Sequence, residues 1–236
     1  MTEEPPRKRM VRAPTGGDPA GRKLGERVKT AGDRSMSSAE WLRRQLNDPY
    51  VQQAKAEGWR SRAAFKLIEI DDRFHLLRRG ARVLDLGCAP GGWVQVALKR
   101  GAGAVVGVDL LHVDPISGAE MIEGDFNDPA MPGRLLETLG GAPDLVLSDM
   151  APNTSGHRET DHLRIVNLIE TAAAFAADVL KPGGSFLTKS FQGGAAGELL
   201  QRLKADYTVV KQVKPKASRA ESSEVYLVAT GLRRPG

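Results

Sequence analysis

Four charged residues, two lysines and two carboxylates, occur where they could share one site. Lys189 lies in the apolar segment FLTKS, and Asp149 ends the apolar segment LVLSD. A lysine in such a segment is unusual, because lysines are seldom buried without a partner. Lys66 is flanked by phenylalanine and leucine, and Glu224 opens the apolar segment EVYLVA. We expect these four residues to form one buried network; the alternative is that any pair forms an ordinary surface salt bridge.

Such a network could orient a hydroxyl group and remove its proton. An unperturbed lysine is protonated at neutral pH and cannot act as a base. Burial or a neighbouring cation lowers the pKa of a lysine, whereas nearby carboxylates raise it. The set of charges therefore favours activation of an oxygen nucleophile, with the proton handled by a lysine whose surroundings are tuned.

A glycine-rich turn follows the apolar segment VLDL. Gly87, Gly91 and Gly92 let the backbone approach a ligand closely, which a β-carbon would hinder. The spacing G-x-x-x-G-G differs from the G-x-G-x-x-G turn that cradles a pyrophosphate, which disfavours a nicotinamide or flavin dinucleotide. Trp93 opens the helix after this turn, where it either packs in the core or forms an aromatic wall beside a ligand.

Carboxylates also lie at the ends of three successive apolar segments. Asp109 follows Gly91 by 18 positions, where an acid can accept both hydroxyls of a ribose. Asp125, in the segment EGDF, could accept a hydrogen bond from an adenine amino group, and Asp85 could orient the rest of the cofactor. A helix cap or a turn is the alternative role for each acid by itself. Together the three acids predict a nucleoside-type cofactor.

These residues require a sheet whose strands end at one edge, where α/β sheets bind their ligands. Most apolar segments after Gly80 lack polar alternation, as expected for parallel strands covered by helices on both faces. Roughly ten residues join the last two strands, too few for a parallel crossover, so we expect an antiparallel final pair. The pattern predicts an α/β, Rossmann-like fold of seven mostly parallel strands with an antiparallel last strand. We expect strands at 82–87, 104–110, 119–124, 144–150, 184–190, 207–213 and 224–230, and helices near 61–77, 92–100, 130–139, 160–180 and 195–205.

The chain of 236 residues divides by composition into two parts. Residues 1–35 contain nine lysines and arginines and five acids, so they hold +4 of the net charge of +5. We expect a basic, disordered arm there, because the segment is rich in proline and glycine and has no apolar period. Residues 36–236 form one predicted domain, whose first helix opens with a capping box, Ser37 or Ser38 ahead of Glu40.

Composition also excludes some kinds of site and indicates where in the cell the protein is located. Cys88 is the only cysteine, which excludes an intramolecular disulfide and a C-x-x-C zinc site. No apolar run reaches the roughly 18 residues that span a bilayer, and the N-terminus lacks the apolar region of a secretory signal. We therefore expect a cytoplasmic protein with no membrane partner, and a monomer.

Seven motifs, in order along most of the chain, carry a resemblance to a known family. They are SRAAFKLIEID, VLDLGCAPGGWVQVAL, GVDLLHVDPI, GDFNDP, LSDMAPNTSGHRETDHLR, LKPGGSFLTKSFQG and SRAESSEVYLVATG. Together they resemble the FtsJ-type methyltransferases, most closely the bacterial members that methylate the ribose of a uridine in large-subunit ribosomal RNA. The resemblance implies S-adenosyl-L-methionine as cofactor, no metal, and a place in ribosomal RNA processing and ribosome biogenesis.

The resemblance also implies roles for single residues. The family's lysine–aspartate–lysine–glutamate tetrad falls on Lys66, Asp149, Lys189 and Glu224. Lys189 would deprotonate or steer the 2'-hydroxyl, Asp149 and Lys66 would tune it, and Glu224 would help to position the acceptor. Asp85 would face the methionine part of the cofactor. The family's other cofactor positions fall on Gly91, Trp93, Asp109, Asp125 and Asp149.

Basic residues around the predicted tetrad are the candidates for RNA binding. We expect them on both sides of the tetrad, although a solvated surface is the alternative for each. Aromatic residues make up only 5% of the chain, which favours recognition of RNA by its shape and backbone over stacking on bases. The candidates are Arg60, Arg62, Lys214, Lys216 and Arg219, with Arg73, Arg78 and Arg79 as further positions.

We expect methylation of ribosomal RNA to occur within the large ribosomal subunit. The sequence leaves two alternatives to this function. One is the same ribose 2'-O-methylation on transfer RNA or on an mRNA cap. The other is a ribosome assembly factor that binds the cofactor and for which catalysis is secondary. A complete tetrad argues against the assembly factor.

Overall fold

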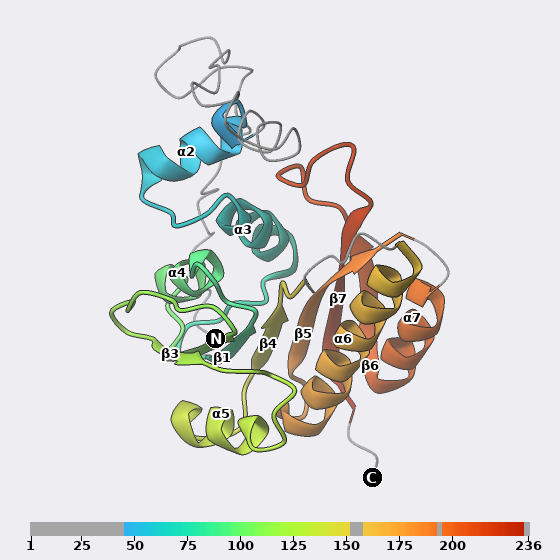
Figure 1. Cartoon of the computed structure of the whole chain (residues 1–236). Helices are drawn as coiled ribbons and strands as arrows, with labels where there is room; N and C mark the ends of the chain where they lie inside the picture. Colours follow the sequence, from blue (N-terminus) through green and yellow to red (C-terminus); the bar gives the residue numbers. More distant parts are fainter. Residues whose placement is uncertain (1–44, 152–157, 193–194, 234–236) are drawn as a thin grey trace, which may run out of the picture.

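The computed structural model describes residues 45–151, 158–192 and 195–233 (Figure 1). The predicted basic arm, residues 1–35, and the predicted capping box at Ser37 or Ser38 lie outside these residues. Within the described ranges, no helix combines the length and the apolar character needed to cross a membrane.

A seven-stranded sheet forms the centre of the protein, in the order β3-β2-β1-β4-β5-β7-β6. The first five strands of this order are parallel, and β7 pairs antiparallel with both β5 and β6. The predicted α/β fold with an antiparallel last strand is therefore confirmed, and each strand lies within a few residues of its predicted place. The strands are β1 (Arg82–Leu86), β2 (Ala104–Asp109), β3 (Glu120–Glu123), β4 (Leu145–Ser148), β5 (Ser185–Phe191), β6 (Tyr207–Val213) and β7 (Glu224–Leu232).

Helices cover both faces of the sheet, as the continuous apolar strands predicted. Successive side chains of a strand point to opposite faces, so Val83 packs with α3 and α4, whereas Leu84 packs with α5 and α6. Figure 1 shows α3 and α4 on one side of the strands and α6 and α7 on the other. The helices are α2 (Pro49–Glu57), α3 (Ala63–Phe74), α4 (Gly92–Lys99), α5 (Met131–Leu139), α6 (Arg158–Val179) and α7 (Ala195–Asp206).

A helix that was not among the predicted elements begins at Pro49. The chain leaves helical geometry at Asp48, whose carboxylate accepts a hydrogen bond from the backbone N–H of Tyr50 at 3.0 Å. Pro49 follows as the first residue of α2. A proline suits a first helical turn because it lacks an N–H, and it disfavours helical geometry in the residue before it. Asp48 and Pro49 therefore start a new helix.

The carboxyl ends of β1, β4 and β5 share one edge of the sheet. The order of the strands reverses at β1, which lies between β2 and β4, and this is where sheets of this class bind ligands. The connection between β6 and β7, residues 214–223, rises at the same edge beside α3 (Figure 1). Three segments that are distant in sequence therefore meet around the ends of β4 and β5.

Candidate active site

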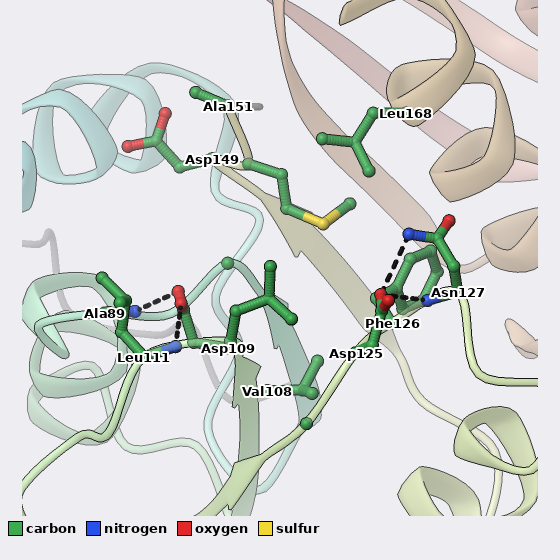
Figure 2. Close-up of a pocket in the computed structure, with 14 residues that line it drawn as sticks. Ala89, Val108, Asp109, Leu111, Asp125, Phe126, Asn127, Asp149, Ala151 and Leu168 are labelled. Atoms are coloured by element: carbon green, nitrogen blue, oxygen red, sulfur yellow. Dashed lines mark hydrogen bonds between the residues drawn. The ribbon is translucent and has the colours of Figure 1, made fainter. Parts of the chain in front are cut away.

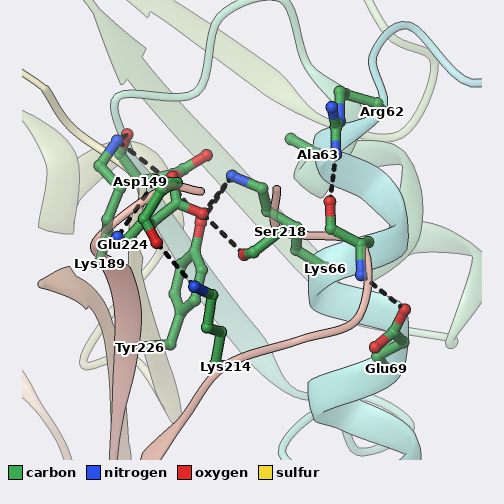
Figure 3. Close-up of polar contacts among 12 residues, drawn as sticks. Arg62, Ala63, Lys66, Glu69, Asp149, Lys189, Lys214, Ser218, Glu224 and Tyr226 are labelled. Atoms are coloured by element: carbon green, nitrogen blue, oxygen red, sulfur yellow. Dashed lines mark hydrogen bonds and ion pairs between the residues drawn. The ribbon is translucent and has the colours of Figure 1, made fainter. Parts of the chain in front are cut away.

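The four predicted network residues lie together at the carboxyl ends of β4 and β5 (Figure 3). The Nζ atom of Lys189 lies 2.6 Å from the carbonyl oxygen of Asp149 and 3.2 Å from its carboxylate Oδ1. On α3, the Nζ atom of Lys66 lies 2.7 Å from Oε1 of Glu224, the first residue of β7. One helix, two strands and the residue after β4 thus supply two ion pairs, and all four side chains are less than one-fifth exposed.

Tyr226 joins these two ion pairs and was not among the predicted residues. Its hydroxyl donates a hydrogen bond to Oδ1 of Asp149 at 2.9 Å and accepts one from Nζ of Lys66 at 3.1 Å. Tyr226 lies two residues after Glu224, on the same face of β7, and directly opposite Lys189 in the β5–β7 pair. This two-residue spacing was the signal in the sequence that could have identified it.

The loop between β6 and β7 holds Glu224 against Lys66. The hydroxyl of Ser218 donates to Oε1 of Glu224 at 2.8 Å. The loop is fixed in turn by Glu69 of α3, whose carboxylate accepts two consecutive backbone N–H groups of the loop at 2.7 and 3.1 Å. Neither Ser218 nor Glu69 was predicted, because their roles depend on the loop folding back on the helix.

The electrostatics of the network fix two protonation states. Burial by itself would raise the pKa of Glu224, but the charge of Lys66 and the hydrogen bonds from Lys66 and Ser218 lower it below its usual value. Burial, and then the charges of Asp149 and Glu224, raise the pKa of Tyr226 well above its usual value. At neutral pH, Glu224 is therefore a carboxylate and Tyr226 keeps the proton that it donates to Asp149.

A cavity of about 440 Å³ lies beside the network (Figure 2). Asp149 lines this cavity and also belongs to the network, so the two adjoin. The volume is in the range of small-molecule sites. The predicted cofactor residues on its wall are Gly87, Asp109, Asp125 and Asp149, and its unpredicted apolar walls include Leu110, Leu111, Phe126, Met150 and Leu168.

Two of these acids also shape the backbone around the cavity. Oδ2 of Asp109 accepts the N–H of Ala89 at 2.8 Å, and Oδ1 accepts the N–H of Leu111 at 2.9 Å, which ties the end of β2 to the glycine turn. Oδ1 of Asp125 accepts the backbone N–H and the side-chain amide of Asn127, at 2.8 and 3.0 Å. A carboxylate has about four acceptor sites, so the turn-forming role and ligand binding are compatible.

Asp85 lies in the core rather than on the wall of the cavity. Its side chain is in the middle of a buried strand, the residue is 1% exposed, and neither carboxylate oxygen has a hydrogen-bond partner among the described residues. Burial raises its pKa well above the usual value, and the charges of Asp149 and Asp109 raise it further. An unpaired buried carboxyl is costly, which marks Asp85 as a group that a hydrogen-bond donor of a ligand could satisfy.

Close contacts surround the three glycines of the turn, and two of them, Gly87 and Gly91, also have a positive φ. Gly87 has φ +77°, and a β-carbon there would lie 2.6 Å from the side chain of Met150 across the turn. A β-carbon on Gly91 or Gly92 would lie 2.6 or 2.5 Å from a neighbouring side chain. Of the three, only Gly87 lines this cavity.

Trp93 packs in the core, which was one of its two predicted roles. It is 3% exposed, and its Nε1 donates to the carbonyl oxygen of Ala63 at 2.8 Å. Its ring lies 5.8 Å from the ring of Tyr226, so it supports the network from behind. It is not among the residues that line the cavity.

Arg60, a candidate for RNA binding, connects two loops of the cofactor side. Its guanidinium donates to the carbonyl oxygens of Pro90, Asp114 and Pro115, at 3.2, 2.6 and 2.9 Å. Pro90 belongs to the glycine turn after β1, and the other two belong to the loop after β2. Arg60 therefore connects the turn after β1 to the loop after β2.

The other RNA candidates lie near the network, just before α3 and in the loop after β6. Arg62 forms an ion pair with Asp48, which Arg219 also approaches, at 3.4 Å. Burial, the largest influence, lowers the pKa of Arg62. Lys214 donates to two carbonyl oxygens of its own loop, at 3.0 and 2.6 Å, and Lys216 is exposed.

The expectation that all basic candidates flank the tetrad is wrong for Arg78 and Arg79. They lie between α3 and β1, just before Arg82 starts the strand. They are therefore at the amino ends of the strands, on the edge of the sheet opposite the tetrad. The predicted helix ran to 77, immediately before them, whereas α3 ends at Phe74, where His75 takes a left-handed conformation with φ 53°.

The sequence and the fold both match known proteins. The sequence model of the FtsJ-like methyltransferases matches residues 59–232. The ribosomal RNA large subunit methyltransferase E of Caulobacter sp. (strain K31) is 59% identical, over 95% of this chain and 99% of the relative. The protein of the same name from Gluconobacter oxydans (strain 621H) is 62% identical, over 87% of this chain and 77% of the relative. Among solved structures, a ribosomal RNA methyltransferase of Plasmodium falciparum has a TM-score of 0.67 at 31% identity, covering 74% of this chain and 98% of its own.

Proposed function

We propose, since this chain belongs to the FtsJ-like methyltransferase family, that it methylates the 2'-hydroxyl of a uridine ribose in large-subunit ribosomal RNA. S-adenosyl-L-methionine is the methyl donor. Methylation of ribosomal RNA follows from relatives that carry this activity in their names over almost the whole chain. The observation that supports a hydroxyl acceptor is the tetrad of Lys66, Asp149, Lys189 and Glu224, joined by Tyr226 at the edge of the cavity.

The cavity fits a nucleoside linked to an amino acid. Asp109 and Asp125 line one part of it, with free acceptor capacity for ribose hydroxyls and an adenine amino group. Asp85 is not on the wall of this cavity. It lies in the core near the two lining acids Asp109 and Asp149, and its carboxyl, which has no partner in the described structure, would have to become accessible in order to bind the ammonium group of a methionine. When bound, S-adenosyl-L-methionine supplies a methyl group on a positively charged sulfur, which is already activated for displacement.

The residues of the chain then have to bring an oxygen into line and take its proton. Asp149 belongs to both the cavity and the network, so an acceptor hydroxyl held by Asp149 and Lys189 is at the boundary of the two. As this oxygen takes the methyl group that the cofactor would supply, its hydroxyl proton would leave toward the Lys189–Asp149 pair. Alignment of the oxygen and removal of its proton are the two contributions that these residues make to the rate of methyl transfer.

Lys66 and Glu224 act on the reacting oxygen indirectly, through the other residues of the network. Tyr226 keeps Lys66 within reach of Asp149, and the positive charge of Lys66 stabilises the carboxylate form of Glu224. We assign Glu224 to positioning the acceptor and Lys66 to tuning the Lys189–Asp149 pair. Among the predicted RNA contacts near the tetrad, Lys214 and Lys216 are exposed, whereas Arg62 and Arg219 are partly buried.

Mapping of ribose methylation tests this function. Cells that lack the gene are complemented with the wild type, with Lys189→Ala, or with Lys204→Ala, an exposed lysine of α7 as the matched control. We expect methylation at one uridine of the large-subunit RNA to return with the wild type and the control and to stay absent with Lys189→Ala. Restoration by Lys189→Ala would contradict the tetrad. Loss confined to transfer RNA or to a cap would favour the first alternative, and no change in any RNA would favour an assembly factor.

A further inference from the structure

A second cavity, of about 330 Å³, lies at the amino ends of β1, β4 and β5. We call it the amino-end pocket. Three connections line it: the segment between α3 and β1, the residue before β4, and the turn before β5. Its lining residues are Leu76, Arg78, Arg79, Gly80, Ala81, Asp144 and Lys181 to Ser185.

The amino-end pocket is separate from the tetrad, because β4 stands between them. Asp144 precedes β4 and lines the pocket, whereas Asp149 follows β4 and belongs to the tetrad. Five residues of extended chain place them about 16 Å apart at 3.3 Å per residue. One nucleotide cannot occupy both sites, so any ligand of the amino-end pocket is a different group from the acceptor ribose.

Three cations and one acid line the amino-end pocket. Asp144 is already neutralised, since Nζ of Lys181 lies 2.8 Å from its Oδ1 and the backbone N–H of Arg82 donates to its Oδ2 at 2.8 Å. Arg78 and Arg79 are exposed, and neither guanidinium has a hydrogen bond or an ion pair within the described residues. The pocket thus presents two uncompensated positive charges to solvent.

These two arginines differ from three other arginines near the sheet. Arg60 and Arg62 are held by carbonyl oxygens or a carboxylate, and Arg100 is held by Asp71 and Asp72. Backbone N–H groups at the pocket are also engaged: those of Gly80, Gly183 and Gly184 donate to carbonyl oxygens. A ligand would therefore be recognised by the guanidinium groups, which match the oxygens of a phosphate in a bidentate manner.

We propose that the amino-end pocket binds a backbone phosphate of RNA, through Arg78 and Arg79, at a segment separate from the one that enters the active site. This inference rests on the proposed function, in which the substrate is a large polyanion. RNA contacts at the active site and at the amino-end pocket, on opposite edges of the sheet, let the protein recognise the shape of a folded RNA independently of its bases. A short RNA that carries only the target nucleotide would not reach this second site.

The test compares Arg78→Ala/Arg79→Ala with Arg134→Ala/Arg202→Ala, which removes the same charge from exposed positions on α5 and α7. Initial rates of methylation are measured on large ribosomal subunits, on the protein-free large-subunit RNA and on a short target hairpin, over a range of salt concentrations. For Arg78→Ala/Arg79→Ala on the two large substrates, we expect KM to rise about tenfold and the slope of log KM against log salt to fall by about one for each phosphate that the variant no longer binds. We expect kcat, the Kd of S-adenosyl-L-methionine and the rates on the hairpin to stay unchanged.

Three outcomes would overturn the inference while leaving the proposed function intact. KM could rise no more than in the control variant, or it could rise equally on the hairpin. It could also rise on whole subunits but not on protein-free RNA, which would assign the pocket to a ribosomal protein. Failure of the wild type to methylate either large RNA substrate would instead overturn the proposed function. Circular dichroism and thermal unfolding of both double variants are the control for correct folding.

Discussion

At the carboxyl end of β4, Asp149 contacts Lys189 and Tyr226, whereas at the amino end of the same strand Asp144 shares a pocket with two exposed arginines. The side chains at the first end are buried and cross-linked in one network. Those at the second end are exposed, and two of them have no partner in the described structure. Groups that handle a proton must be held in place, whereas groups that bind a polyanion must remain available to it.

The largest effect that this contrast predicts is at Lys189. Lys189→Ala removes the amine that faces Asp149, and we expect the rate of methyl transfer to fall by a factor of roughly 10² to 10⁴. The Kd of S-adenosyl-L-methionine, measured by calorimetry, should change less than about twofold, since Lys189 does not line the cavity. A single-turnover assay on large subunits measures the rate. A fall of less than tenfold would mean that holding the hydroxyl, rather than taking its proton, is the main contribution of the network.

Tyr226→Phe tests whether the two ion pairs act as one network. The variant keeps the ring that packs on Trp93 but loses the hydroxyl between Lys66 and Asp149. Hydrogen bonds to charged groups contribute about 1.5 to 3 kcal/mol, so we expect kcat to fall by about tenfold to a hundredfold. Tyr207→Phe is the matched control, because the buried hydroxyl of Tyr207 has no partner among the described residues. Equal activity of the two variants would show that the ion pairs work separately.

Arg60→Ala distinguishes a role in the cofactor site from the RNA contact predicted from the sequence. Loss of its three hydrogen bonds to carbonyl oxygens should loosen the turn after β1 and the loop after β2. We expect the Kd of S-adenosyl-L-methionine to rise by about tenfold, which corresponds to about 1.4 kcal/mol. KM for RNA should not change. The opposite pattern, a higher KM for RNA with an unchanged Kd, would restore Arg60 to the RNA-binding surface.

Asp85 and Asp144, near opposite ends of the sheet, should have opposite effects on the pH dependence of stability. The raised pKa of Asp85 means that the folded protein binds its proton more tightly than the unfolded chain. Stability is then lost as the pH rises above the unfolded pKa of about 3.9. Asp85→Asn should therefore raise the Tm of the cofactor-free protein, and the difference from the wild type should grow with pH.

For Asp144, burial by itself would raise the pKa, but the hydrogen bond from Lys181 leads the contributions that lower it. Its stabilisation is present above the unfolded pKa of about 3.9 and is lost as the pH falls through the lower folded pKa. Asp144→Asn should lower the Tm slightly at neutral pH and leave it unchanged in acid. Thermal unfolding between pH 2 and pH 8 measures both variants, because the effect of Asp144 disappears only below its lowered folded pKa. Parallel Tm curves for wild type and Asp85→Asn would show that Asp85 has a partner in solution.

Much of the fold could be predicted, because its signals are local. Continuous apolar strands separated by helical segments are enough for a doubly covered parallel sheet, and the short connection between 213 and 224 is enough for an antiparallel final pair. The start of α2 was missed although its signal, aspartate before proline, is also local. The helix after Ser61 was predicted too long, because its apolar period continues past Phe74 while the backbone turns at His75.

The sequence by itself determined which charged residues are candidates for the site: the tetrad and the acids at the strand ends could be selected from residue type, apolar surroundings and resemblance. Only the tertiary structure decided how they are connected. Tyr226 links the ion pairs because β7 pairs with β5 in one register, and Ser218 reaches Glu224 because its loop folds onto Glu69. Tertiary structure likewise separated Arg60 from Arg78, which the sequence grouped as one kind of basic residue. The physical reason is that residue type sets what a side chain can bind, whereas packing sets which partners lie within about 3 Å of it.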